Sequence, residues 1–525
     1  MSAVPDSPEV LSALSEVIGC ERIKINPAEL EYFSQDYFRK GELTLAVVAP
    51  RNVDELSRLV ATATGKGLAI FPRGGGYSYT DGYNPTQPGI TLDLQEMDAI
   101  LEINEGDMYV TVEPGCTWAK LNDALEPLNL RTPFWGPFSG FNATIGGSIS
   151  QGSITWGASK YGVSSESVLD LAIVAADGKV VRTGASGQPG HSPFFRNYGP
   201  DLTGIFCSDC GALGIKAAIT LRLVNRPART LGLSFGFPSF EAGAEAACRV
   251  AREGIVADSF GVSSETAIAA AGKGSLADDL RSLWMVGKSG NGPIDGAVRM
   301  TRVAIAGRRF LNAAPFSFHF IIDGANRKMI EGQAQAVRAA IGISGTEIAN
   351  TMPTMARADP FVPYDMLSFS GQRQLPPSTI LPLTQAVPFH RAFKAAVGQR
   401  EKQMKRHNMN VQPTLSTVGT NGFLYEPLIA WDDKPEEFHR RHTSDKVLEM
   451  ASGREANMDA RELAAEIRQI MIDLAFEHGG IHLQIGKVYP YLRERDENAV
   501  AILKDIKRRM DPEGLLNPGA LGLSR

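Results

Sequence analysis

Cysteine and long apolar runs are scarce in this sequence, and both shortages narrow the class of protein. Five Cys in 525 residues are too few for a disulfide framework, which favours a reducing compartment. No run of about 18 apolar residues occurs, so we expect no membrane-spanning helix and no membrane partner. The first residues lack a basic start followed by an apolar run, so we expect no signal peptide and predict a cytoplasmic protein.

An excess of charge of one sign is also missing. The formal net charge is −5 and charged residues make up 21% of the chain, so the composition does not favour a nucleic-acid partner. Cys207 and Cys210 form a single C-x-x-C pair with no second pair at ligand spacing. We therefore expect no zinc or other metal site.

The common nucleotide-binding motifs are absent. No G-x-G-x-x-G follows a predicted strand and opens a helix, which argues against a Rossmann site. Gly287-Lys288-Ser289 resembles the end of a P-loop, but Ser282 stands where that motif requires glycine and no strand precedes it. We therefore expect neither a Rossmann domain nor a P-loop nucleotidase.

The length predicts two or three domains, and the pattern changes near residue 226. Residues 45–49 and 68–71 are typical of buried strands, and Asn52 precedes an amphipathic helix between them, so this part reads as a βαβ unit. Asn225-Arg226-Pro227 ends this alternation. We predict domains over residues 1–225 and 226–460, followed by a C-terminal segment over 461–525.

The remaining elements are predicted from helical and strand periodicity. We expect helices near Phe389–Lys405, Pro435–Met450, Ala460–Glu477 and Glu497–Met510, an irregular segment from Pro360 to Pro388, and a strand over Ile481–Lys487. His439 and His442 lie among arginines, which indicates a solvated helix face.

Three loops rich in small residues stand out among the 53 Gly of the chain. The first runs from Pro72 through Gly74-Gly75-Gly76 to Ser78 and directly follows a predicted strand. The second runs from Asn142 to Ser153, and the third is Cys210-Gly211-Ala212-Leu213-Gly214. Glycine lets backbone N–H groups converge on an anion, so the three loops together favour a long dinucleotide held by backbone. Each loop taken alone could equally be a structural turn.

Taken in order, these segments resemble the vanillyl-alcohol-oxidase/p-cresol-methylhydroxylase family of flavoproteins. The resemblance rests on Val47–Val53, Arg73–Gly76, Val112–Trp118, Gly146-Gly147, Tyr161-Gly162, Val174–Gly178, Gly204–Phe206, Gly214-Ile215 and Asp511–Gly519, and more weakly on Leu424–Pro427. The C-terminal motif and the Tyr161-Gly162 turn are also similar to the neighbouring glycolate and D-lactate dehydrogenase branch.

The resemblance implies an α+β fold in which both ends of the chain build one FAD-binding domain around a cap. The cap would be an antiparallel sheet flanked by helices, and the segment 461–525 would return to the FAD domain and line the active site. The implied FAD-binding residues are Pro72, Arg73, Gly74, Gly75, Gly76, Tyr77, Ser78, Thr144, Ile145, Gly146, Gly147, Ser148, Gly152, Ser153, Gly214, Ile215 and Asn517.

One departure concerns how the cofactor is attached. Many relatives carry a histidine, bonded covalently to the flavin, where this chain has Tyr77. His390 is a weak candidate for attachment from the cap. We therefore expect FAD to be bound non-covalently.

The substrate side matches the phenol-oxidising relatives only in part. Tyr79 occupies the position of a phenolate-binding tyrosine, whereas His482 and Leu483 stand where relatives carry a Tyr-Arg pair, and Val163 replaces an acidic residue. If residues 481–487 form a strand, alternation places His482, Gln484 and Gly486 on one face, where His482 could act as a base or be an ordinary core histidine. The predicted catalytic set is Tyr79, His482, Gln484, Tyr425, Glu426 and Lys487, with Tyr425 and Glu426 facing the same cavity and Tyr489, Tyr491 and Arg493 in reserve.

The resemblance implies hydride transfer from a small aromatic alcohol or para-substituted phenol to flavin N5. Two alternatives remain: oxidation of a 2-hydroxy acid, which a cluster of Arg or Lys around a carboxylate would favour, and cleavage of a phenolic side chain through a quinone methide without net redox change. Oxygen or another acceptor would take the electrons, and relatives suggest a homo-oligomer.

Overall fold

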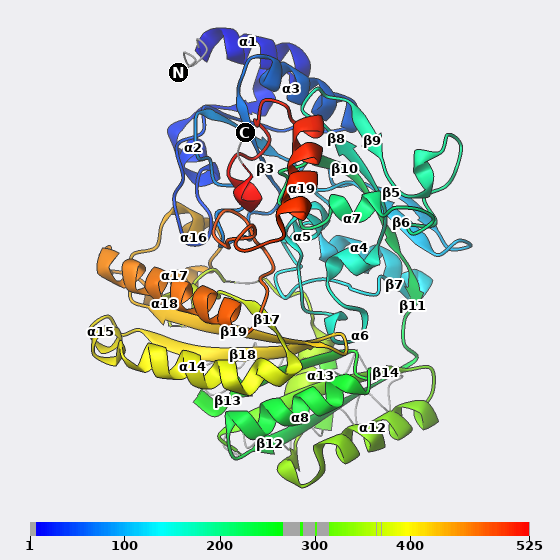
Figure 1. The fold of residues 1–525 in the computed structure, drawn as a ribbon, viewed down its shortest axis with the longest axis vertical. Coiled ribbons are helices and arrows are strands. Elements are labelled where there is room, and N and C mark those ends of the chain that lie inside the picture. Colours follow the sequence, from blue (N-terminus) through cyan, green and yellow to red (C-terminus); the bar gives the residue numbers. More distant parts are fainter. Residues whose placement is uncertain are drawn as a thin grey trace. The chain divides into compact units, whose positions relative to one another are not determined.

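A computed structural model describes residues 7–265, 284–286, 300–301, 314–363, 365–368 and 370–523 (Figure 1). The P-loop-like Gly287-Lys288-Ser289 lies outside these ranges. Contacts group the chain into a terminal unit, residues 1–153, 163–225 and 483–525, and a central unit, residues 154–162 and 226–482. Helices and strands are mixed throughout, which confirms the α+β class. The predicted three-part domain division stays a prediction.

The terminal unit contains the predicted βαβ arrangement in a four-stranded sheet. Its strand order is β1 (Ile23–Lys24), β2 (Ala46–Val48), β4 (Gly89–Asp93), β3 (Ala69–Arg73), with β2 and β3 both parallel to β4. Helix α3 (Val53–Gly65) connects β2 to β3 and begins where the Asn52 side chain accepts a hydrogen bond from the Glu55 N–H. Its buried residues Leu56, Leu59, Val60 and Ala63 join the core that covers this sheet, as the periodicity predicts.

A second, antiparallel sheet of five strands completes the terminal unit. Its order is β5 (Ile100–Asn104), β6 (Tyr109–Val112), β10 (Ile215–Arg222), β8 (Val168–Val174), β9 (Val180–Arg182). The short strands β7 (Leu130–Arg131) and β11 (Val224–Asn225) pair separately. The other helices are α1 (Ser7–Ile18), α2 (Pro27–Phe33), α4 (Trp118–Leu125), α5 (Ile145–Gln151), α7 (Leu202–Ile205) and α19 (Glu497–Met510).

The central unit is built on one antiparallel sheet. Its order is β15 (Thr346–Ile348), β12 (Arg229–Phe237), β14 (Phe316–Gly324), β13 (Asp258–Ser263), β18 (Asn410–Val418), β19 (Gly422–Trp431), β16 (Arg373–Leu375), and β17 (Thr379–Pro382) also pairs with β19. The helices are α6 (Ala158–Tyr161), α8 (Phe240–Arg252), α12 (Arg327–Ile341), α13 (Thr351–Ala358), α14 (Ala386–Gly398), α15 (Glu401–Arg406), α16 (Glu437–Arg441), α17 (Asp445–Met450) and α18 (Met458–Glu477). Helices α8 and α12 pack on β12 and β14 (Figure 1). In the ranges that the structure covers, no helix is both long and apolar enough to traverse a bilayer.

The predicted strand over Ile481–Lys487 does not form. Only Ile481 makes a β-bridge, to Ile380, and the following residues are turns. Gln484 and Gly486 have φ values of 53° and 56°, in the left-handed region, which breaks the strand alternation. The inference that His482, Gln484 and Gly486 share one strand face is therefore wrong.

Other predicted elements differ in their limits. The helix expected over Phe389–Lys405 divides into α14 and α15 after Gly398, because glycine is a poor helix former. The single helix expected over Pro435–Met450 is also divided, into α16 and α17. The segment from Pro360 to Pro388 is not irregular throughout, because it contains β16 and β17. His439 is 1% exposed rather than solvated, because its Nδ1 accepts the Glu436 N–H at the start of α16.

Two buried histidines make the central unit sensitive to acid. His319 lies between the Ser234 and Ser317 hydroxyls, and His390 bonds the Tyr425 hydroxyl through Nδ1 at 2.9 Å. Burial lowers the pKa of His319 to about 3 and that of His390 to about 4, while Glu241 opposes and Arg391 and Lys394 reinforce the shift at His390. Below the unfolded value of 6.5 the unfolded chain therefore binds more protons than the folded chain.

We predict that the free energy of unfolding does not depend on these histidines above pH 6.5 and decreases as the pH drops towards 4. Protonation of His390 in the unfolded chain alone should lower it by about 3 kcal/mol. Thermal unfolding as a function of pH measures this slope. His390→Gln should flatten it, whereas His191→Gln, on an exposed loop, should leave it unchanged. Equal slopes for the wild type and His390→Gln would contradict the assignment.

Candidate cofactor site

The three glycine-rich loops of the terminal unit lie against one another. We call them loop A (residues 72–78), loop B (residues 142–153) and loop C (residues 207–214). A Cβ atom added to Gly74 would collide with Thr144 Oγ1, and one added to Gly75 would collide with the Asn142 carbonyl oxygen. At Gly211 an added Cβ would lie 2.8 Å from Pro72 Cγ. Loop A therefore touches both loop B and loop C through positions where only glycine fits.

Loops B and C are joined by backbone hydrogen bonds. The Ser208 N–H donates to the Ile149 carbonyl at 2.8 Å, and the Cys210 N–H donates to the Ser150 carbonyl at 2.8 Å. The three loops thus converge on one region, although more than a hundred residues separate Gly75 from Cys210 in the chain. This convergence is the arrangement that the sequence predicts for a single bound dinucleotide.

The amides of loop A fit an anionic ligand. Gly75 and Gly76 are buried, and Gly76 has a left-handed φ of 83°. Among the described residues, the N–H groups of Gly74, Gly75 and Gly76 make no hydrogen bond to a protein acceptor. A buried N–H group without an acceptor is costly, so these three consecutive donors are suited to phosphate oxygens.

Arg73 lies behind this loop rather than beside a ligand. Its guanidinium carbon is 4.3, 4.4 and 5.0 Å from the ring centroids of Tyr32, Phe33 and Tyr83, and Nη1 donates to the Tyr32 carbonyl. A Cβ added to Gly76 would lie 2.6 Å from its Nη2. Arg73 therefore supports the loop backbone and places a positive charge beneath the three amides.

Loop B is held by its own side chains. The Thr144 hydroxyl accepts the Gly147 N–H at 3.2 Å and caps α5, while the Ser148 hydroxyl accepts Trp118 Nε1–H at 2.8 Å. Gly146 packs against Pro114, and beyond the helix the Ser153 N–H donates to the Ser164 hydroxyl at 3.0 Å. Ile145, also predicted as a contact, is fully buried in the core and its N–H donates to the Cys116 carbonyl at 2.8 Å, so neither its side chain nor its N–H is available to a ligand.

Loop C is fixed by a buried ion pair that sequence patterns do not reveal. Lys216 Nζ donates to the Asp209 carboxylate, which also accepts the Gly211 and Leu213 N–H groups, and both charged side chains are almost fully buried. Gly214 packs against Ile173 and leads into β10 at Ile215. The one available signal was Lys216 among the apolar residues that begin β10, since a buried lysine requires a carboxylate partner.

The C-terminal segment reaches the same loops. Lys507, at the end of α19, donates to the Ala212 and Leu516 carbonyls and to Asp511, and burial lowers its pKa. Lys487 and Asn517 bond to residues beside loop A and in loop C, as described below. The four-residue spacing of Lys507 and Asp511 was the sequence signal for this contact between the C-terminal segment and loop C.

The predicted substrate residues fall in different places. In the terminal unit, Tyr79 packs edge-on against Tyr37 with ring centroids 6.5 Å apart, and the Gln484 N–H donates to the Gln151 carbonyl of loop B at 2.7 Å. Lys487 is partly buried and its ammonium group donates to two backbone carbonyls. Its position argues for a structural rather than a catalytic role.

In the central unit, Tyr425 and Glu426 are neighbours on β19. Tyr425 is 1% exposed and its hydroxyl bonds His390, which stacks on Phe240 with centroids 3.5 Å apart. Adjacent strand residues point to opposite faces, so the inference that Tyr425 and Glu426 face one cavity is wrong. His482 is partly buried and its Nδ1 lies 2.8 Å from the Ser378 carbonyl.

We predict that Gly75→Ala weakens FAD binding at least about tenfold, because its methyl group forces loop A away from the Asn142 carbonyl. Titration of the apoprotein with FAD, followed by flavin fluorescence, measures the Kd. Gly65→Ala, at the end of α3, is the matched control, since its added methyl group would meet no atom within 4 Å apart from its chain neighbours and the backbone of its own helix. Wild-type affinity in Gly75→Ala would refute the close packing of loops A and B.

Family comparison agrees with this geometry. A family model described as an FAD binding domain matches residues 44–184, and one described as FAD linked oxidases, C-terminal domain, matches residues 445–521. The chain is 30% identical over 248 residues to a protein named probable D-lactate dehydrogenase, mitochondrial, of Danio rerio, covering 47% of this chain and 48% of that protein. It is 36% identical over 182 residues to glycolate oxidase subunit GlcD of Bacillus subtilis, covering 35% of this chain and 37% of that protein. The chain thus spans less than half the length of these two relatives.

Other similarities extend over the whole chain. An uncharacterized FAD-linked oxidoreductase of Mycobacterium tuberculosis is 21% identical, covering 98% of this chain and 99% of that protein. The structure of p-cresol methylhydroxylase with substrate bound has a TM-score of 0.71 at 16% identity, covering 100% of this chain and 98% of that chain. The 4-ethylphenol oxidase of Gulosibacter chungangensis has a TM-score of 0.71 at 19% identity, covering 99% and 98%.

The two structural matches share the fold, and the two domain matches specify the cofactor. Three loops of small residues meet where a dinucleotide needs backbone donors. The first matched domain includes loops A and B, and the second includes the C-terminal residues Lys487, Lys507 and Asn517 that bond to or beside these loops. The chain therefore carries an FAD binding domain and an FAD-linked oxidase C-terminal domain, with FAD as its cofactor and a fold shared with p-cresol methylhydroxylase.

Proposed function

We propose that this chain is an FAD-dependent oxidoreductase that oxidises a small aromatic alcohol or a para-substituted phenol. Two solved structures that share its fold over nearly the whole chain are named for p-cresol and 4-ethylphenol. The stronger sequence similarities, to proteins named for D-lactate and glycolate, favour a second candidate, oxidation of a 2-hydroxy acid. The two candidates differ in one physical requirement, a positive charge for the substrate carboxylate.

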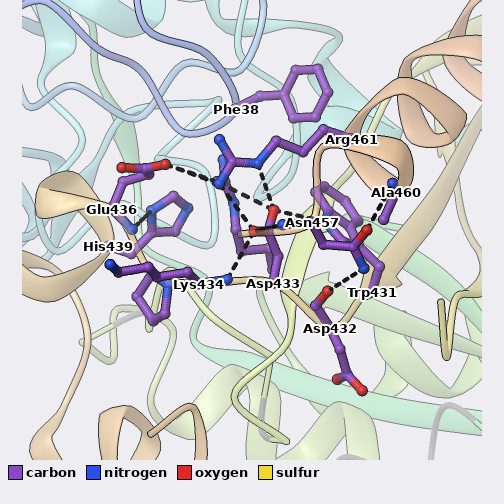
Figure 2. A network of polar contacts seen from close by, with 12 residues as sticks. Phe38, Trp431, Asp432, Asp433, Lys434, Glu436, His439, Asn457, Ala460 and Arg461 are labelled. Carbon is purple, nitrogen blue, oxygen red and sulfur yellow. Dashed lines mark hydrogen bonds and ion pairs between the residues drawn. The ribbon is translucent and has the colours of Figure 1, made fainter. Parts of the chain in front are cut away.

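The arginine networks of the central unit favour the uncharged substrate. Figure 2 shows Asp433 at the centre of one network, where Arg461 donates to both carboxylate oxygens at 2.7 and 3.0 Å. Arg373 lies 3.5 Å from Asp433 and 3.8 Å from Glu436, and Arg461 also contacts Glu436 at 2.9 Å. Asp433 further accepts Trp431 Nε1–H and two backbone N–H groups. Two guanidinium groups are thus balanced by two carboxylates.

The second network has an excess of negative charge. Arg357 donates to Asp258 at 3.0 Å and to Asp323 at 2.6 Å, and Thr230 donates to the other oxygen of Asp323. Neither network therefore offers positive charge to a substrate carboxylate. The lack of spare positive charge in these two described networks is the observation that carries the proposal, because a substrate carboxylate buried against them without a matching cation would be strongly destabilised.

His482 is the residue best suited to take the substrate proton. The Ser378 carbonyl can only accept, so Nδ1 of His482 carries the proton and Nε2 carries the lone pair. Burial lowers the pKa of His482, which keeps the imidazole neutral near pH 7. FAD, when bound, supplies the hydride acceptor. In the proposed reaction Nε2 accepts the hydroxyl proton as the carbon loses hydride.

Anaerobic mixing tests the substrate class. We expect 4-hydroxybenzyl alcohol or 4-ethylphenol to remove the oxidised-flavin absorbance of the holoenzyme, and D-lactate and glycolate to leave it unchanged. Oxygen or another acceptor should then restore the spectrum. Reduction by D-lactate alone would establish the second candidate, and a phenolic product formed without use of an acceptor would indicate side-chain cleavage.

We predict that His482→Gln lowers the rate of flavin reduction at least about 100-fold, because general-base catalysis is lost while flavin binding is retained. Because burial lowers the pKa of His482 from its usual 6.5, the wild-type rate should hold down to that pH and fall only at more acidic pH, and the variant rate should not show this fall. Stopped-flow reduction across pH measures both. His478→Gln, on a nearby histidine that bonds Gln385, is the control. A variant with the wild-type rate and pH profile would exclude His482 as the base.

We predict that FAD is released by acid denaturation, with the yellow colour in the supernatant. Tyr77 replaces the histidine that relatives bond to flavin, and its hydroxyl accepts Asn142 Nδ2–H at 2.5 Å. His390, the alternative attachment point, is stacked on Phe240 and bonded to Tyr425 in the central unit. A coloured pellet would overturn the prediction, and its loss in His390→Gln would identify the attachment point.

A further inference from the structure

A partly buried lysine of the C-terminal segment has all its donors matched. Lys487 Nζ donates to the Asp81 carbonyl at 2.9 Å, the Asn84 carbonyl at 3.1 Å and Asn517 Oδ1 at 2.7 Å. An ammonium group has three N–H donors, so this set of acceptors is complete. Asp81 and Asn84 lie on the turn that directly follows loop A, so the lysine fixes that turn from the far end of the chain.

Asn517 continues this contact towards loop C. Its Nδ2 group donates to the Gly82 carbonyl at 2.6 Å and to the Cys210 carbonyl at 2.5 Å, while Oδ1 accepts from Lys487. The side chain is 1% exposed, and both amide hydrogens are committed to protein carbonyls. Asn517 therefore acts on the cofactor loops and not as an amide donor to FAD.

Cys210 carries the contact on to loop B. Besides accepting from Asn517, it donates its N–H to the Ser150 carbonyl and its sulfur accepts the Gly486 N–H at 3.2 Å. It is 2% exposed and has a left-handed φ of 53°, a conformation that costs energy for any residue except glycine. Contacts from three distant segments hold this residue in place.

We propose that Lys487 and Asn517 form a clasp by which the C-terminal segment positions loops A and C for FAD, so that the clasp sets how tightly the cofactor is held. Both are positioning residues, because their polar atoms bond protein groups rather than the ligand. The clasp joins the turn at Asp81–Asn84 to Cys210, so its loss frees both sides of the cofactor site together. The proposal depends on FAD binding and is independent of the substrate.

Two variants separate the halves of the clasp. Lys487→Met keeps the length of the side chain but removes all three donors. Asn517→Asp keeps an acceptor for Lys487 but places carboxylate oxygens against the Gly82 and Cys210 carbonyls. Lys504→Met, on an exposed position of α19, is the matched control.

We predict that both variants raise the Kd of FAD at least tenfold, measured by fluorescence titration of the apoprotein. Both should also increase labelling of Cys210 by a thiol reagent in the FAD-bound protein, measured by peptide mass spectrometry, with exposed Cys20 as the internal reference. The control should match the wild type in both measurements. A variant that melts earlier but keeps the wild-type Kd and labelling would show a purely structural role and overturn the proposal.

Wild-type protein gives a second test should a variant fail to fold. Burial lowers the pKa of Lys487 to about 8, opposed by Asp81, Asp36 and Cys210. Above pH 8 the lysine loses one donor and its charge, so FAD release should accelerate as the pH rises from 7 to 10. A release rate that stays constant over this range would contradict the proposal.

Discussion

The structure depends on the close approach of loops A and B. Gly74 and Gly75 pack so tightly on Thr144 and Asn142 that no other residue fits, and the three N–H groups of residues 74–76 find no acceptor in the part of the chain that the structure describes. Burying such donors is unfavourable unless a ligand supplies the acceptors. The cofactor is therefore part of the energy balance of the terminal unit, and residues that maintain the approach influence FAD binding without touching it.

Buried charge has a consistent role in both units. Arg73 lies among aromatic rings, Lys216 is paired with Asp209, and Lys487 is surrounded by carbonyl groups. In the central unit Asp433 and Asp258 each bind an arginine from a different element. The Lys216–Asp209 pair is local to loop C, whereas the other ions connect segments that are distant in the chain, so the charges fix loop positions rather than face solvent. A substrate without charge is compatible with this arrangement because it leaves every pair intact.

Local sequence patterns predicted part of this architecture. The βαβ unit followed from an apolar helix face after Asn52, and the three loops followed from glycine content, because both features depend on neighbouring residues. The strand expected over Ile481–Lys487 failed for the opposite reason. Gln484 bonds Gln151 and Gly486 bonds Cys210, and these long-range contacts impose left-handed backbone where the local pattern favours a strand.

The role of Lys487 could not be read from its surroundings in sequence. Its acceptors Asp81 and Asn84 lie about four hundred residues earlier, and a lysine beside His482 and Gln484 in sequence suggested catalysis. His482 ends the central unit, and only Leu483 separates it from Gln484, which bonds loop B. One short segment thus joins the proposed base to the cofactor loops. A change in the clasp at Lys487 therefore acts on FAD through loops A and C, whereas a change at His482 acts on the proton, and the two effects are separable by measuring binding and reduction independently.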